Sequence, residues 1–311
     1  MSFTRKNRCD QSAKPYLGVR RTVLKHDYVP EIGAGSILSA RPSIGTLLRD
    51  SVRLATKTTQ SWSLFWIAFQ WCIIAGEWDL SIAMLEQCAI LKPDFIPYFD
   101  RYCGCAFAEV QRANVFKGAT DEPSTYPGSL PGTQDLIKER LALMHAINRS
   151  RPVPPLSVPD DVVLKPLEIP GATNLGKFAW LIDSDSRLGQ TCEIFLGGRY
   201  FWIPFDIICE VNLAPVMSLV DRVWRQAIVR LRSGESYAGL LPARYVGTQF
   251  ADDDLKLGQT TLWIQLGGAL QAGLGERQFR CDRGAQWRIS RLTVIRFDAN
   301  AGGRNDSNLP H

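Results

Sequence analysis

The chain has 311 residues, of which 45% are hydrophobic, 22% charged and 10% aromatic, a composition typical of a well-packed globular protein. Its longest apolar run, residues 62–75, is shorter than the roughly 20 residues of a membrane-spanning helix, and the first 30 residues lack the apolar segment of a signal peptide. The sequence therefore predicts a cytoplasmic protein without a membrane span.

The net charge of +5 comes entirely from one end of the chain. Residues 1–30 contain seven basic and two acidic side chains, which leaves 29 of each sign in residues 31–311. A nucleic-acid-binding protein carries its positive charge on the folded body, so we expect no nucleic-acid partner. We expect residues 1–30 to be a basic, disordered tail, and residues 299–311 to be a second disordered tail.

The N-terminal half has the periodicity of packed helices. Apolar residues at helical spacing predict a helix over residues 62–75, and further helices are predicted over 80–91, 44–57 and 134–148, with a weaker one over 34–40. Another helix is expected to begin at Asp94 as N-cap and to end at Gly118. Pairs of antiparallel helices joined by a glycine turn resemble tetratricopeptide (TPR) repeats. Residues 31–148 are therefore expected to form a TPR-like helical domain.

Six prolines in residues 149–172 predict a semi-rigid linker, and strand patterns follow over residues 173–298. Residues 192–196 and 199–203 flank Gly197-Gly198, a two-residue hairpin signal. A second hairpin is expected over residues 228–241, further strands over 207–213, 261–266 and 287–297, and a loop at 273–275. The predicted fold class is α+β: N-terminal TPR-like helical hairpins followed by a mainly antiparallel C-terminal β barrel or rolled sheet.

Few residues in the sequence are suited to catalysis. The three histidines lie far in sequence from the polar clusters, and no phosphate-binding loop is present, so we expect no catalytic residue and no cofactor. Asp183 and Asp185, with the acidic run 252–254, offer carboxylates for Mg²⁺ or Ca²⁺. Arg187 is close enough to neutralise them, which favours a turn with an ion pair over a metal site. A metal-dependent enzyme using Asp183 and Asp185 stays the alternative.

Several aromatic and charged residues form a second set of candidates. Tyr200, Trp202 and Tyr245 are of the type that stacks on nucleobases, but Tyr200 and Trp202 share a strand whose other face is also bulky, which indicates burial on both sides. Glu109 and Arg112, three residues apart on a predicted helix, are expected to form an exposed ion pair.

Several blocks of residues, in order along residues 34–297, resemble the ImpE family, also called TagJ or SciE-type proteins. The blocks are Trp180-x2-Asp-x-Asp-Ser-Arg-Leu-Gly189, Gly198-Arg-Tyr-x-Trp-x-Pro-Phe205, Leu241-Pro-x-Arg-Tyr-x-Gly247, Gly273-Leu-Gly275, Ala75-Gly-Glu-Trp78, Leu85-Glu86 and Glu109-x2-Arg-x2-Val-Phe-x-Gly118. The chain departs from the family pattern at Gln190, Arg225, Gln226 and Glu276.

The resemblance implies a non-catalytic accessory protein of bacterial type VI secretion. Such an adaptor is expected to bind the N-terminal helical segment of the small sheath subunit and to assist the unfoldase ClpV, a second partner, in recycling the sheath. A generic helical-repeat scaffold for another partner is a further alternative. The residues expected to form the partner-binding or structural signature are Glu109, Arg112, Asp183, Asp185, Arg187, Tyr200, Trp202, Arg244 and Tyr245.

Overall fold

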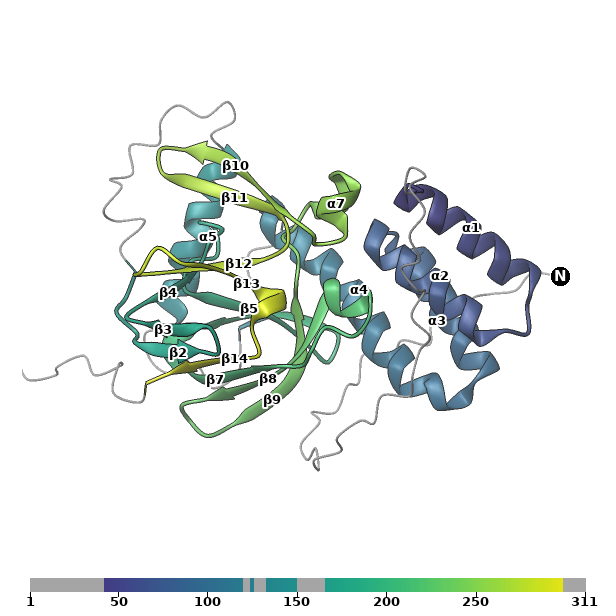
Figure 1. The fold of residues 1–311 in the computed structure, drawn as a ribbon. Helices are drawn as coiled ribbons and strands as arrows, with labels where there is room; N and C mark the ends of the chain where they lie inside the picture. Colours follow the sequence, from purple (N-terminus) through teal and green to yellow (C-terminus); the bar gives the residue numbers. More distant parts are fainter. Residues whose placement is uncertain (1–41, 120–123, 126–132, 150–165, 299–311) are drawn as a thin grey trace, which may run out of the picture. The chain divides into compact units, whose positions relative to one another are not determined.

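The computed structural model describes residues 42–119, 124–125, 133–149 and 166–298. They have an α+β fold in which helices come first and a large, mainly antiparallel sheet follows (Figure 1). The two predicted tails, the predicted helix over 34–40 and most of the predicted linker lie outside these residues. The proposed domain boundaries stay predictions. Among the described residues, no helix combines the length and the apolar character needed to cross a membrane.

Four consecutive helices pack each on the next: α1, α2, α3 and α4. The predictions over residues 44–57 and 62–75 are confirmed at both ends. The predicted start of α4 at Asp94 is wrong, because Pro93 opens a 3₁₀ turn in which the buried Phe95 ring contacts Trp62 and Trp66. The helices are α1 (Ile44–Lys57), α2 (Trp62–Ala75), α3 (Trp78–Leu91), α4 (Ile96–Lys117), α5 (Thr133–Arg149) and the short α7 (Asp253–Lys256).

The large sheet has nine strands in the order β1-β6-β5-β9-β8-β7-β14-β2-β3, and every pair in it is antiparallel except β1–β6. Its strands are β1 (Ser124–Thr125), β2 (Gly171–Thr173), β3 (Gly176–Phe178), β5 (Thr191–Leu196), β6 (Arg199–Pro204), β7 (Ile208–Leu213), β8 (Trp224–Leu231), β9 (Ser236–Pro242) and β14 (Val294–Phe297). Both predicted hairpins, β5–β6 and β8–β9, are confirmed.

The predicted barrel is wrong, because the large sheet is open. A barrel requires its two edge strands to pair with each other, whereas β1 and β3 are two and three residues long and do not pair. Two smaller sheets accompany it: the hairpin β10–β11, and β13-β12-β4. Their strands are β4 (Leu181–Asp183), β10 (Thr261–Gly267), β11 (Leu270–Gly275), β12 (Gln278–Cys281) and β13 (Gln286–Arg288).

Residues 273–275, predicted as a loop, instead belong to strand β11. Gly273 lies directly against the ring of Tyr245, and a Cβ atom there would be 2.2 Å from the ring carbon Cδ2. Glycine at this position allows the strand to approach the ring closely.

Helices and sheet share one hydrophobic cluster, and a second cluster lies within the β-rich part. In the shared cluster the fully buried ring of Trp224 on β8 lies 5.9 Å from Trp78, 6.1 Å from Tyr102 and 6.5 Å from Phe69, measured between ring centroids. Helices α2, α3 and α4 therefore contact the sheet through large aromatic side chains, which contribute most of the buried apolar area of such a contact.

Candidate functional site: a buried charge network between helix α4 and the sheet

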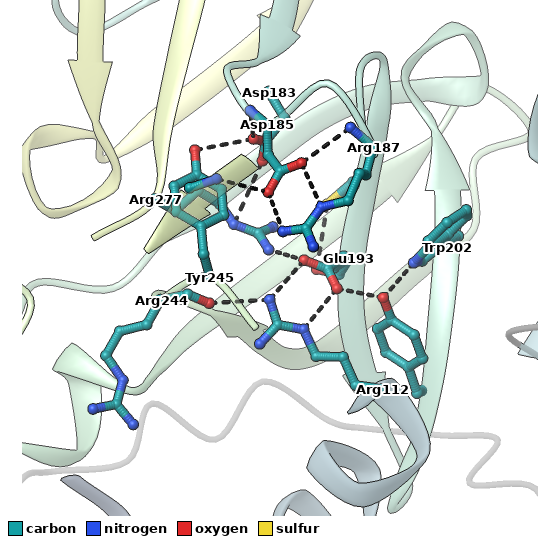
Figure 2. Close-up of polar contacts among 12 residues, drawn as sticks. Arg112, Asp183, Asp185, Arg187, Glu193, Trp202, Arg244, Tyr245 and Arg277 are labelled. Carbon is teal, nitrogen blue, oxygen red and sulfur yellow. Dashed lines mark hydrogen bonds and ion pairs between the residues drawn. The ribbon is translucent and has the colours of Figure 1, made fainter. Parts of the chain in front are cut away.

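The centre of the site is the carboxylate of Glu193 on β5, which is completely buried (Figure 2). Arg112 of α4 donates to it twice, from Nε to Oε1 at 2.7 Å and from Nη2 to Oε2 at 3.0 Å. Arg277 contacts Oε2 from the opposite side, and the Tyr200 hydroxyl donates to Oε1. The indole N–H of Trp202 donates in turn to the Tyr200 hydroxyl. Trp202 lies close to Glu193 because the two residues are opposite each other in the β5–β6 register.

The pair Glu109–Arg112 is buried, so the prediction of an exposed ion pair is wrong. Arg112 Nη1 lies 3.3 Å from Glu109 Oε2, and the Trp224 indole donates to Glu109 Oε1 at 3.0 Å. Helix α4 lies against β6 because two glycines permit it: a Cβ atom on Gly104 would be 2.7 Å from the Cα of Gly198. The face of α4 that carries the ion pair is therefore covered by the sheet.

The Asp-Ser-Asp turn forms the second part of the network. Asp185 accepts from Arg187 Nε at 2.9 Å and from Nη2 at 2.5 Å, which confirms the predicted ion pair. Asp183 Oδ1 accepts from the Tyr245 hydroxyl at 3.0 Å, and Asp183 Oδ2 lies 3.5 Å from Arg277 Nε. Arg277 therefore links the two parts, because it contacts both Asp183 and Glu193 (Figure 2).

Arg244 connects the network to helix α2. Its peptide carbonyl accepts from Arg112 Nη2 at 3.0 Å. Its guanidinium donates to the carbonyls of Ile73 and Ile74 at 3.0 and 2.9 Å, in the last turn of α2. A cation at this end of a helix is favoured, because the terminal carbonyls have no partners within the helix. Arg244 thus attaches α2 to the β-rich part, even though burial lowers the pKa of its guanidinium to about 10.

The network contains equal numbers of acidic and basic side chains. It contains four carboxylates (Glu109, Asp183, Asp185 and Glu193) and four guanidiniums (Arg112, Arg187, Arg244 and Arg277). All are buried except Arg187, whose side chain is 16% exposed. Removing so many charges from water is costly unless each finds a partner, which explains the density of the contacts.

The carboxyl group of Asp183 has a strongly raised pKa. Burial raises the pKa of its carboxyl to about 7, and this effect outweighs the opposing influence of Arg277. Arg277 also contacts Glu193, so the same guanidinium serves two carboxylates. We therefore expect Asp183 to change its protonation near neutral pH.

The geometry of the Asp-Ser-Asp turn disfavours metal binding there. Asp183 and Asp185 face the guanidiniums of Arg277 and Arg187, where a metal ion would meet positive charge. Across the described ranges, no three His, Cys, Asp or Glu side chains gather into a metal-binding group. Burial also raises the pKa of the Cys72, Cys88 and Cys192 thiols to about 12, which keeps these thiols protonated and unreactive.

The acidic run at residues 252–254, which also offered carboxylates for a metal ion, lies at the N-terminus of α7. Asp253 Oδ2 accepts from the backbone N–H of Ile44 at 2.8 Å, so this carboxylate caps the N-terminus of α1. An acidic group at this end of a helix is favourable, because the first N–H groups have no partners within the helix.

All nine predicted site residues belong to this network, but sequence reasoning missed Glu193, Arg277 and Trp224. A signal for Glu193 was present, because it is the one charged residue in the otherwise apolar strand 192–196. Three of the four departures from the family pattern make side-chain contacts. Gln190 bonds both backbone groups of Leu167, Arg225 donates to the carbonyls of Ala214 and Leu292, and Glu276 pairs with Arg288.

Comparison with known proteins identifies the β-rich part. Residues 176–293 match the family model "ImpE protein". The chain is 28% identical over 217 residues to the type VI secretion system accessory component TagJ of Pseudomonas aeruginosa, an alignment that covers 70% of this chain and 74% of TagJ. The crystal structure of protein VPA1032 from Vibrio parahaemolyticus has the same fold, with a TM-score of 0.68 and 20% identity over 82% of this chain and 94% of VPA1032. The predicted resemblance to the ImpE family is confirmed, with residues 176–293 as the region that matches its model.

Proposed function

We propose that this chain is a non-catalytic accessory component of a bacterial type VI secretion system and acts in the cytoplasm. In this proposal it binds the N-terminal helical segment of the small sheath subunit and assists ClpV in recycling the sheath. The observation that carries the proposal is the similarity to TagJ, which extends over 70% of this chain and therefore reaches beyond the ImpE region.

The chemistry of the buried network supports a non-catalytic role. Its carboxylates are held by guanidiniums and hydroxyls of the same chain, at distances such as 2.7 Å for Arg112 Nε to Glu193 Oε1. A general acid or base must reach a substrate, whereas Glu193 and Asp185 are completely buried. We infer that the nine signature residues position the helices on the sheet and leave recognition to the surface.

We propose the exposed face of α4 as the surface that binds the sheath segment. Ile96, Phe107 and Val110 are 51%, 47% and 47% exposed. At about 100° per residue, these three positions lie within roughly 60° of each other around the helix, so they form one apolar stripe. An amphipathic helix binds such a stripe through its own apolar face, in the way that TPR-like helical pairs hold peptide segments.

A binding titration tests both parts of the proposal. The purified chain is titrated into a fluorescently labelled N-terminal helical peptide of the small sheath subunit from the same organism. We expect saturable binding of micromolar or tighter affinity, which a scrambled peptide loses. Phe107→Asp should weaken binding about tenfold or more, because an interface centre tolerates an unpaired charge poorly.

The matched control is Ile228→Asp, which places the same charge on a residue of β8 that is 51% exposed. This control should bind as the parent does. If both variants weaken peptide binding equally, α4 is excluded as the binding surface. Absence of binding to both the peptide and the intact sheath complex would overturn the proposed function.

A further inference from the structure

The hairpin β10–β11 is attached to the rest of the molecule along one edge. In its register, Gly275, Gly273 and Gln271 lie opposite Thr261, Trp263 and Gln265. The outward N–H groups of β11 are all used, from Gly273 to Asp185 Oδ2 at 3.0 Å, from Gln271 to Ser186 Oγ at 3.0 Å and from Gly275 to Thr248 Oγ1 at 2.9 Å. The edge formed by β11 is therefore satisfied by the protein itself.

The edge formed by β10 is unsatisfied. Residues opposite each other in an antiparallel pair either exchange hydrogen bonds or both point their backbone groups outward. Since Gly273 and Gln271 point outward, the N–H and C=O groups of Thr261, Trp263 and Gln265 point outward from β10. No described residue forms a hydrogen bond with these backbone groups.

This edge lacks the usual protection against pairing with another strand. Residues 259–275 contain no charged side chain. The edge strands β1 and β3 of the large sheet are only two and three residues long, whereas β10 has seven residues. Proteins normally keep an exposed edge short or charged, because a long apolar edge is a template for a further strand.

The side chains of β10 divide between the two faces of the hairpin. The Trp263 ring packs on Tyr245, with 5.6 Å between ring centroids. Leu262 and Ile264 point to the other face and are 52% and 43% exposed. Two exposed apolar side chains therefore flank Trp263, whose ring packs on the body of the protein.

We propose that β10 pairs antiparallel with β10 of a second copy of this chain, about a two-fold axis at Trp263. In this register Trp263 lies opposite its own counterpart and Thr261 lies opposite Gln265, so all three outward-facing backbone positions gain partners at once. Leu262 lies opposite Ile264 of the second copy, in the closely spaced type of pair. The uncharged edge allows two identical strands to meet without like-charge repulsion, which favours a second copy over a charged segment of another protein.

The contact is limited to two strands and their side chains, so we expect a dimer that dissociates on dilution. Sedimentation velocity of the full chain between about 1 and 100 μM covers the range expected for an interface of this class. The parent protein should shift from monomer to dimer with concentration. Leu262→Lys and Ile264→Lys should each give a monomer throughout, because the added charges repel across the axis.

The matched control is Ile228→Lys, which adds the same charge at a residue that is 51% exposed. Ile228 lies on β8, which is paired on both sides, with β7 and β9. This variant should dimerise as the parent does. The melting temperatures of all three variants show whether each is folded, so that loss of the dimer is not mistaken for unfolding.

A cross-linking experiment tests the register directly. In the double variant L262C/I264C, oxidation should link two chains, because position 262 faces position 264 of the other copy; the parent, with its native cysteines alone, is the control. The proposal is overturned if the parent is monomeric at every concentration, or if its dimer persists in folded Leu262→Lys and Ile264→Lys variants. Either result is independent of binding to the sheath peptide.

Discussion

Two parts of the contact between helices and sheet are built from opposite kinds of side chain. Around Trp224, helices α2, α3 and α4 contact β8 through aromatic rings, with Trp78, Phe69 and Tyr102 as neighbours. Around Glu193, α4 contacts β5 through charged groups at distances down to 2.7 Å. Apolar contacts stabilise without requiring one particular geometry, whereas buried ion pairs tolerate few arrangements and carry a desolvation cost.

The difference indicates a division of roles. We infer that the aromatic part supplies most of the stability of the contact and that the charged part fixes how α4 lies on the sheet. Variants of the charged part should therefore be costly when they remove one partner and leave the other charge buried. The following variants test this inference.

The largest effect is expected for Glu193→Ala. This change leaves the guanidiniums of Arg112 and Arg277 buried without their common carboxylate. Breaking a buried pair in this way costs about 3–5 kcal/mol, which urea denaturation measures as a lower midpoint. Glu210→Ala is the control, because it removes two ion pairs with the exposed residues Arg230 and Arg296 and should cost at most about 1 kcal/mol. Equal losses for the two variants would show that the buried network has no special role.

The next effect concerns the approach of α4 to the sheet. Gly104→Ala adds a methyl group that would lie 2.7 Å from the Cα atom of Gly198, so helix or hairpin must shift. Overpacking of this kind costs about 1–3 kcal/mol. Gly45→Ala is a suitable control, because the same atom on α1 would have no neighbour closer than 3.8 Å. A melting temperature equal to that of the parent for Gly104→Ala would contradict the close contact.

Arg187→Ala should lower the free energy of unfolding by about 1–3 kcal/mol, because Asp185 loses its bidentate partner while staying buried. We expect the lower part of this range, since Arg187 is partly exposed and water can replace some of its contacts. Thermal unfolding measures the difference. An unchanged melting midpoint would instead mark Arg187 as a residue available for binding a partner.

The last prediction is a gradual dependence of stability on pH. Burial raises the pKa of Asp183 from 3.8 to about 7, so between these values the folded chain holds a proton that the unfolded chain has lost. The contribution of this group to the free energy of unfolding is therefore present below about pH 4 and falls as pH rises towards 7. The slope is at most about 1.4 kcal/mol per pH unit for one proton. Asp183→Asn should remove this part of the pH profile, and an identical profile in both proteins would contradict the assignment.

Local patterns in the sequence were enough to predict several elements. The apolar spacing of residues 62–75 gave both ends of α2, and Gly197-Gly198 gave the turn between β5 and β6. The bulky residues on both faces of β6 correctly indicated burial on both sides. The pair Asp185–Arg187 was also predictable, because its members are two residues apart. In each case the determining interactions lie within one element or one turn.

Other features were decided only by tertiary contacts. Glu109 and Arg112 form a pair typical of a helix surface, yet the counter-charge and the cover come from Glu193, 81 residues beyond Arg112. Arg277 reaches Glu193 from 84 residues further along the chain, and Gly273 in β11 lies against the ring of Tyr245. The sequence alone thus predicted most of the elements and nine residues of the buried network. The tertiary structure decided which of their charged side chains are buried, because burial depends on surfaces that are distant in sequence.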